Sequence, residues 1–265
     1  MPWVTRGLRN GIVTTGYPLR PDGYGDRYHA AVRVLPGPPP DAGQAAAMAA
    51  SCPTGAVTAD GGTIRLDRGR CILCGRCVER HPQRFAFDPA PEVSALTRRA
   101  LVVDAAGPDD DQAVADARAA LRRRVRALRR SLHIRHVDAG SDGSEEWEVA
   151  ALLNPVYDVQ RLGVFFTASP RHADLLLVTG VATTAMAGAL RRTWEAMPDP
   201  KLVLAAGTDA ASGGLVHPTY ATEGGVAAVL PVDVWVPGSP PSPFALLHGI
   251  LSVLDRLAPG GGQTR

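Results

Sequence analysis

This chain has a single lysine, a small net charge and no long apolar run. Lys201 is the only lysine among 28 basic residues, which, with the many Ala, Gly and Pro residues, indicates a genomic bias in composition. The net charge of +2 gives no electrostatic support to general nucleic-acid binding. No apolar run approaches the ~18 residues of a membrane-spanning helix, so we expect a soluble or peripheral protein. Without a G-x-G-x-x-G motif after a strand or a Walker lysine, a phosphate-binding loop is not predicted.

The four cysteines all lie in one segment, as Cys52-Pro53 followed by Cys71-x-x-Cys74-x-x-Cys77. In bacterial ferredoxins the run C-x2-C-x2-C-x3-C-P gives three ligands to one cluster, and its Cys-Pro cysteine ligates the other. The spacing therefore predicts one cuboidal 4Fe-4S cluster, with Cys52 as the distant fourth ligand. Structural zinc, which prefers two separated C-x2-4-C pairs, is the alternative. Disulfides are not expected, because no signal peptide is evident and intracellular thiols stay reduced.

A second ferredoxin cluster is not predicted. Counting back from Cys52, its first three ligands would stand at Ala42, Ala45 and Met48, and its fourth at His81. None of these residues supplies the thiolate that iron–sulfur clusters require. We interpret His81 as a loop residue rather than a remaining ligand.

The length of 265 residues and a hydrophobic content of 45% suit one or two domains with a real core. We expect an arm at 1–34, a ferredoxin-like α+β unit at 35–90, a linker and basic helix at 91–131, an α/β domain at 132–258 and a tail at 259–265. Within the ferredoxin-like unit, 45–50 is helix-prone. Residues 56–58 and 63–66 flank Asp60-Gly61-Gly62 and predict a hairpin.

Residues from Asp109 onward follow a helical pattern. The apolar positions recur at sevens, fours and threes, at Val114, Leu121, Val125, Leu128 and Leu132. Aspartates begin the segment and arginines end it, as the helix dipole favours. The remaining face is basic and comprises Arg118, Arg122, Arg123, Arg124, Arg126, Arg129 and Arg130. This face is either simply solvated or docks on a partner subunit or an anionic membrane surface.

Residues 132–258 alternate between strand-like and helix-like segments. Short apolar runs lie at 165–168, 175–179, 202–206 and 232–236, and helical stretches lie at 183–197 and 243–257. This alternation predicts an open parallel sheet of the flavodoxin-like α/β type, with its sites beyond the carboxyl ends of the strands. We expect Arg171, His172 and Asp174, just before a buried strand, to hold a turn by hydrogen bonds.

Several segments of this second half resemble one known family. They are RSLHIRHVDAG at 130–140, ALLNP at 151–155, YDV at 157–159, SPRHADLLLVTG at 169–180, MPDPK at 197–201, PVDV at 231–234 and VPG at 236–238. The family holds the B subunit of bacterial NADH-quinone oxidoreductase and the small subunits of energy-converting NiFe hydrogenases. The first half looks like the ferredoxin-type subunit of formate hydrogenlyase-type complexes, so the chain resembles a fusion of the two.

The resemblance also identifies a lost cluster site. Four family cysteines hold a 4Fe-4S cluster, and they fall here on Asp142, Glu145, Asp209 and Ser239. Carboxylates and a hydroxyl are not the soft ligands that such clusters require, so we infer that the domain keeps the fold without the cluster. Its carboxylates could instead bind magnesium, calcium or manganese, or an oxygen-ligated iron centre, or could line a wet pocket or a subunit interface.

The resemblance implies a non-catalytic iron–sulfur subunit, for electron transfer and assembly, in a membrane-associated hydrogenase-like or NADH-quinone oxidoreductase-like complex. Its expected partners are the large subunit, which carries the nickel–iron or quinone site, and the membrane subunits. The expected location is cytoplasmic, on the inner face of the cytoplasmic membrane through those partners. The alternatives are a structural or regulatory subunit in which the cluster only stabilises the fold, and a divalent-metal site on the old scaffold.

Overall fold

The computed structural model describes residues 2–20, 23–24, 28–108, 111–126, 128 and 131–255. The expected tail at 259–265 therefore lies outside the described residues, as do Asp109, Asp110, Arg129 and Arg130 of the basic segment. None of the described helices is both long and apolar enough to cross a bilayer.

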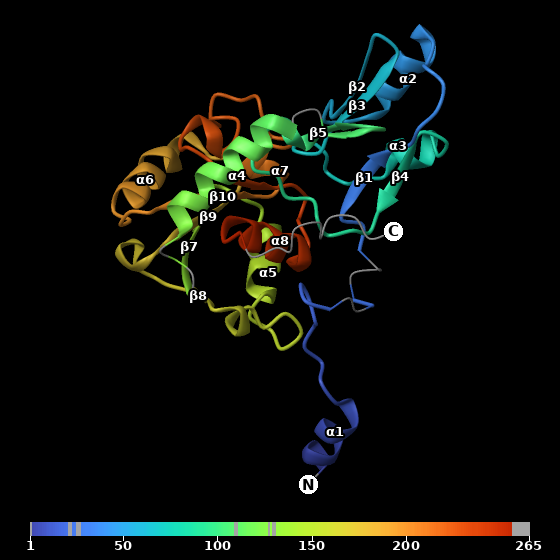
Figure 1. Cartoon of the computed structure of the whole chain (residues 1–265). Coiled ribbons are helices and arrows are strands. Elements are labelled where there is room, and N and C mark those ends of the chain that lie inside the picture. Colours follow the sequence, from blue (N-terminus) through green and yellow to red (C-terminus); the bar gives the residue numbers. More distant parts are fainter. Residues whose placement is uncertain are drawn as a thin grey trace.

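The N-terminal arm begins with a helix, α1 (Pro2–Asn10), which stands away from the rest of the chain in Figure 1. The arm then runs along the second domain. The backbone N–H of Thr15 donates to the Val156 carbonyl at 2.8 Å. Farther on, the rings of Tyr17 and Tyr28 pack edge-on against the ring of Phe244, and in each pair the ring centroids are 5.7 Å apart. These contacts fix the later part of the arm to the helix that contains Phe244.

The ferredoxin-like unit contains two small antiparallel sheets. One pairs β1 (Ala31–Val34) with β4 (Phe85–Asp88), and the other has the order β2-β3-β5-β6. β2 (Val57–Asp60) and β3 (Thr63–Asp67) form the expected hairpin, with Asp60 opposite Thr63. Gly61 and Gly62 both have positive φ, as a two-residue hairpin turn of this hand requires.

Two further strands of this sheet come from the segment expected to be a linker. β5 (Val102–Asp104) pairs with β3, and β6 (Gly107–Pro108) pairs with β5. Just before them, the short helix η2 (Arg99–Leu101) follows Arg98, whose guanidinium binds Asp67 through two hydrogen bonds of 2.8 and 2.7 Å. These strands are only three and two residues long, so neither shows an alternating pattern in the sequence.

Two helices complete the unit, α2 (Ala42–Ser51) and α3 (Arg76–Arg80). α2 contains the helix expected at 45–50 and begins with a capping box between Asp41 and Gln44. Met48, which stands where a second cluster would need a cysteine, is buried in the apolar core of the unit with Leu66 and Phe85.

The second domain is built on a five-stranded sheet with the order β8-β7-β9-β10-β11, in which every pair is parallel. The strands are β7 (Leu132–Asp138), β8 (Val164–Phe166), β9 (Leu175–Thr179), β10 (Leu202–Ala206) and β11 (Val234–Val236). In sequence order this is 2-1-3-4-5, the flavodoxin-like arrangement. The predicted fold class is therefore confirmed, and β9 and β10 have the expected bounds.

Helices cover both faces of this sheet (Figure 1). α4 (Asp111–Val125), α5 (Ser144–Ala151) and α8 (Pro243–Val253) pack on the face that includes Leu175 and Leu177. α6 (Thr184–Glu195) and α7 (Thr208–Ser212) pack on the face of Leu176 and Val178. Because neighbouring residues of β9 bury on opposite faces, its whole length is apolar.

Among the described residues, short 3-10 helices also cap or connect these elements: η2, described above, η3 (Val159–Leu162), η4 (Pro170–His172) and η5 (Val226–Ala228). Asp174, at the start of β9, accepts the backbone N–H of His133 at 2.8 Å, the kind of structural hydrogen bond expected there.

The basic helix α4 uses part of its charge inside the molecule. Leu121 and Val125 are buried against the second domain. Arg122 pairs with Asp255 at 2.6 Å, and Arg124 pairs with Asp233 and donates to the Lys201 carbonyl. These two arginines therefore tether α4 to the second domain instead of adding to a purely solvated basic surface.

Candidate functional site

The structure brings the four cysteines into one region. Cys52 ends α2, Cys71 and Cys74 lie in the loop after β3, and Cys77 lies buried in the first turn of α3. The loop turns sharply, with Leu73 and Gly75 at φ of +54° and +76°. A side chain at Gly75 would also come within 3.2 Å of the Phe87 ring. Glycine is therefore required where the loop meets α3.

The cysteines act on one another electrostatically. Burial raises the pKa of Cys71 to about 12, a backbone N–H opposes this, and the charges of Cys77, Cys52 and Cys74 raise it further. The pKa of Cys77 is also raised by burial and by Cys52 and Cys74. Four bare thiolates would repel one another here, whereas bound iron would compensate their charge.

The hydrogen bonds around Cys52 favour its thiolate form. Burial opposes its ionisation, but hydrogen bonds outweigh burial and lower its pKa. The Thr54 hydroxyl lies 3.4 Å from Cys52 Sγ, and the backbone N–H of Ala56 donates to the same sulfur at 3.2 Å. Hydrogen bonds to sulfur are among the factors that set the potential of an iron–sulfur cluster. The residues present therefore fit a thiolate-bound cluster.

Within the described part of the chain, no three His, Cys, Asp or Glu side chains are placed to hold a single metal ion. A cuboidal cluster makes a different demand on its ligands, because each thiolate binds its own iron and the sulfurs surround the whole cluster.

The second candidate site lies at the carboxyl edge of the parallel sheet. Asp142 follows β7, Asp209 stands in the first turn of α7 after β10, and Ser239 follows β11. These three residues line one open cavity of about 570 Å³. The backbone N–H of Thr208 donates to the Gly238 carbonyl at 2.7 Å, which joins the last two segments. The edge beyond the carboxyl ends of the adjacent strands β7 and β9 is where flavodoxin-like sheets place their ligands.

Glu145, in the first turn of α5, is buried at this edge with only 1% of its surface exposed. Its carboxylate packs on Gly207, where an added Cβ would lie 2.6 Å from Oε1. Burial raises the pKa of Glu145 to about 7, and the charges of Asp209 and Asp142 add to the effect. The structure thus brings the three carboxylates close enough to influence one another.

The two aspartates respond differently. Burial raises the pKa of Asp209, with a further contribution from Asp142. Hydrogen bonds from Ser144 instead lower the pKa of Asp142, whose Oδ1 accepts the Ser144 hydroxyl at 2.6 Å. The same hydroxyl lies 3.1 Å from Glu145 Oε2. Asp142 is therefore charged, while Glu145 is poised to hold a proton near neutral pH.

The cysteine loop packs directly on this edge of the second domain. The buried Thr208 donates its hydroxyl to the Cys71 carbonyl at 2.9 Å, and Ile72 lines the same cavity as Asp142 and Asp209. Sequence reasoning missed Thr208 and Ile72, and also Arg68, a buried guanidinium whose pKa responds to the charge of Cys71. No local pattern marks these residues, because their contacts join distant parts of the chain.

Comparisons with known proteins find two separate matches along the chain. Residues 143–253 match the family described as NADH ubiquinone oxidoreductase, 20 Kd subunit, and residues 64–123 match a 4Fe-4S single cluster domain. The chain is 42% identical over 129 residues to "Probable membrane-bound hydrogenase subunit mbhJ" of Pyrococcus furiosus, covering 49% of this chain and 77% of the relative. The chain belongs to the 20 kDa subunit family of NADH ubiquinone oxidoreductase. The predicted resemblance of its two halves is confirmed.

The chain is also 40% identical over 147 residues to "Formate hydrogenlyase subunit 7" of Escherichia coli (strain K12). The match covers 56% of each protein, so this chain spans about half the length of that relative. One similar solved structure is that of a membrane-bound sulfane sulfur reductase, described as an archaeal respiratory membrane complex. The matched chain is 33% identical with a TM-score of 0.45, and the match covers 50% of this chain and 73% of that one. Of the cysteines, Cys71, Cys74 and Cys77 lie inside the 4Fe-4S domain match, and Cys52 precedes it.

Proposed function

We propose that the chain is an iron–sulfur subunit, for electron transfer and assembly, of a membrane-associated hydrogenase-like or NADH-quinone oxidoreductase-like complex. Two relatives are named as subunits of formate hydrogenlyase and of a membrane-bound hydrogenase, which supports this class of complex. The proposed partners are a large subunit with a nickel–iron or quinone site, and membrane subunits. Through them the chain would lie on the inner face of the cytoplasmic membrane, without being the catalytic subunit itself.

We propose that Cys52, Cys71, Cys74 and Cys77 hold one 4Fe-4S cluster. The observation that carries this proposal is that four mutually interacting thiols lie in one region, two of them raised in pKa by burial and by their neighbours. When bound, such a cluster supplies one-electron transfer. The protein's own part is to hold the thiolates, to donate N–H hydrogen bonds to Cys52, and to exclude water from Cys77.

We propose in addition that the second domain has lost the family cluster and serves as a docking scaffold. Asp142, Glu145, Asp209 and Ser239 offer oxygen atoms where soft thiolates are required. The hydrogen bond from Thr208 to the Cys71 carbonyl supports the scaffold role, because it fixes the cysteine loop on the same edge of the sheet.

Iron and sulfide analysis with EPR of the reduced protein tests the cluster count. We expect about four irons and four sulfides per chain and one cluster signal. About eight irons would mean that the second domain still holds a cluster, and zinc without sulfide would overturn the redox role altogether.

The alternative that the cluster only stabilises the fold is tested in the assembled complex. Cys74→Ser changes the most exposed of the four cysteines, so the subunit is expected to fold and assemble. We expect the variant complex to lose turnover. Full turnover in an intact complex that lacks the cluster would establish the structural role instead. Ser51→Ala, in the residue before Cys52, is a matched control that leaves all four thiols in place.

A divalent cation at the carboxylates is a second candidate. Among the described residues these carboxylates are not placed to hold a single ion together, so binding would require them to move closer. One observation favours the candidate: Asp209 and Asp142 both raise the pKa of Glu145. Magnesium, calcium or manganese would relieve this repulsion with ligands of the right kind. Metal analysis of a variant without the cysteine-bound cluster decides the matter. A stoichiometric divalent ion that disappears in Asp209→Asn would support the candidate, and its absence before the substitution would reject it.

A further inference from the structure

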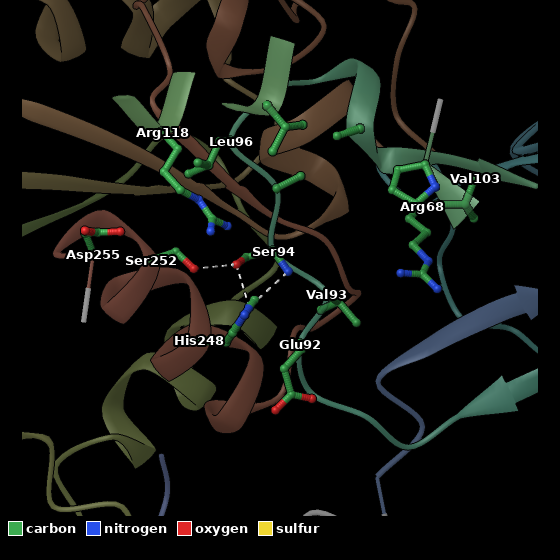
Figure 2. A pocket seen from close by; sticks show the side chains of 14 residues that line it. Arg68, Glu92, Val93, Ser94, Leu96, Val103, Arg118, His248, Ser252 and Asp255 are labelled. Atoms are coloured by element: carbon green, nitrogen blue, oxygen red, sulfur yellow. Dashed lines mark hydrogen bonds between the residues drawn. The ribbon is translucent and has the colours of Figure 1, made fainter. Parts of the chain in front are cut away.

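A second cavity, of about 340 Å³, lies where the ferredoxin-like unit meets the second domain (Figure 2). Arg68 and Val103 line it from the ferredoxin-like unit, and residues 92–96 cross it. Val114 and Arg118 reach it from α4, and His248 and Ser252 reach it from α8. It shares no lining residue with the cavity at Asp142 and Asp209. Its volume falls in the range of small-molecule sites, which occur preferentially between domains.

One side of the cavity carries a chain of polar side chains. The Ser94 hydroxyl lies 2.6 Å from His248 Nδ1, and the Ser94 backbone N–H donates to the same atom at 3.4 Å. Nδ1 is therefore the acceptor, and the neutral ring carries its proton on Nε2. Burial lowers the pKa of His248 to about 4, and the charge of Arg118 lowers it further, so the ring is neutral at physiological pH. The Ser252 hydroxyl follows at 3.3 Å from Ser94 Oγ.

Two guanidinium groups add positive charge to the walls. The Nε atom of Arg68 is buried and has no hydrogen-bond partner among the described residues. Arg118 projects from α4 toward Ser94 and His248 in Figure 2. Arg68 and Arg118 lie on opposite sides of the cavity in Figure 2, and a buried donor without a partner facing a second cation across one cavity is a setting that an anion would stabilise.

The acidic residues at the walls only partly oppose this charge. Asp255 is engaged by Arg122 at 2.6 Å. Glu92 also lines the cavity, and burial raises its pKa. Much of the remaining lining is apolar and includes Val93, Leu96, Val103 and Val114. Two cations against the one carboxylate of Glu92 leave a single positive charge, so the cavity matches a singly charged anion with an apolar body better than a doubly charged phosphate.

We propose that this cavity binds a small carboxylate with an apolar body, its carboxylate between Arg118, Arg68 and the Ser252 hydroxyl and its body against Val93, Leu96 and Val114. The site does not depend on the proposed electron-transfer role. Arg68 nevertheless connects the two regions, because its carbonyl accepts the backbone N–H of Cys71 at 3.2 Å while the residue also lines the cavity.

Titration calorimetry on the full, cluster-loaded chain tests the proposal with benzoate as the probe. Benzamide, which has the same shape without the charge, and inorganic phosphate, which has charge without an apolar body, are the comparison ligands. We expect saturable one-site binding of benzoate and at least about tenfold weaker binding of both comparison ligands, the size of one lost charge-assisted hydrogen bond or more. Absence of benzoate binding, or equal binding of benzamide, would overturn the proposal.

Two variants locate the binding. Arg118→Gln is expected to weaken benzoate binding about tenfold. Arg123→Gln, an exposed arginine on the same helix that does not line the cavity, should leave the affinity unchanged. Val114→Phe, which narrows the cavity from α4, should abolish binding while circular dichroism stays that of the parent. Equal affinities in Arg118→Gln and Arg123→Gln, or full affinity in a folded Val114→Phe protein, would place benzoate elsewhere and refute the site.

Discussion

The buried Glu145 carboxyl group should make the stability of the second domain depend on pH in a definite direction. Its pKa moves from 4.5 to about 7, chiefly through burial. The folded protein therefore holds this proton more tightly than the unfolded chain, and stability is lost as pH rises from 4.5 through 7. At about 1.4 kcal/mol for each tenfold change in proton affinity, ionising Glu145 in place costs about 3 kcal/mol above pH 7.

Glu145→Gln keeps the shape of the side chain and removes the ionisation. We expect the variant to match the parent near pH 4.5 and to exceed it increasingly up to about pH 8, by roughly 6–12 °C in apparent melting temperature. Thermal unfolding of the cluster-loaded chain, followed by circular dichroism across this range, measures the difference. Glu195→Gln, at an exposed position of α6, is the control and should show no trend with pH.

A difference in melting temperature between Glu145→Gln and the parent that does not vary with pH would refute the reasoning, since it would mean that folding does not raise the pKa of Glu145. A variant less stable than the parent at pH 8 would be more informative still. A divalent cation on Asp142, Glu145 and Asp209 would be lost in the variant, so this result would favour the metal site over the protonated carboxyl group.

Two further substitutions test the contacts around this edge. Gly207→Ala should destabilise the protein by about 1–3 kcal/mol, because Gly207 has φ of +98° and the new Cβ would lie 2.6 Å from Glu145 Oε1. The control is Gly188→Ala on α6, where the nearest atom to the new Cβ is 3.7 Å away, and it should be neutral or stabilising in the same melting assay. Thr208→Val removes the hydroxyl that donates to the Cys71 carbonyl, and it should lower the free energy of unfolding by about 1 kcal/mol. The variant should also lose the visible absorbance of the cluster faster in the presence of a chelator. The control is Thr193→Val, whose hydroxyl bonds to Ala189 in its own helix, and it should not speed that loss.

Local pattern was enough to predict much of the fold. The Asp60-Gly61-Gly62 hairpin followed from turn chemistry, because both glycines adopt the positive φ that the turn requires. The apolar runs at 175–179 and 202–206 became β9 and β10 because strands buried on both faces need unbroken apolar sequence. The family resemblance, rather than any local pattern, predicted that Asp142 and Asp209 could converge, and both line one cavity at the carboxyl edge of the sheet.

The contacts between the two halves could not be predicted in this way. β5 and β6 are too short to show periodicity, and they belong to the first sheet only because β3 lies beside them. The cavity at Arg68 and His248 forms from residues about 180 positions apart, in elements whose own patterns reflect local burial alone. Arg68 itself looks like any other arginine in a loop until its burial and its nearness to Cys71 are seen.

The contact between Thr208 and Cys71 also bears on why a domain without its family cluster would be retained. If the cysteine loop folded without contacting the second domain, a second domain that lacks the family cysteines would have no part in positioning a cluster. Instead Thr208, the residue before Asp209, binds the carbonyl of a predicted cluster ligand, and Ile72 of the cysteine loop lines the cavity where the family cluster would sit. A side chain at Gly207 large enough to disturb Glu145 would therefore also displace the start of α7 and the loop that rests on it. This coupling supports the proposal that the second domain now positions a cluster held by its neighbour.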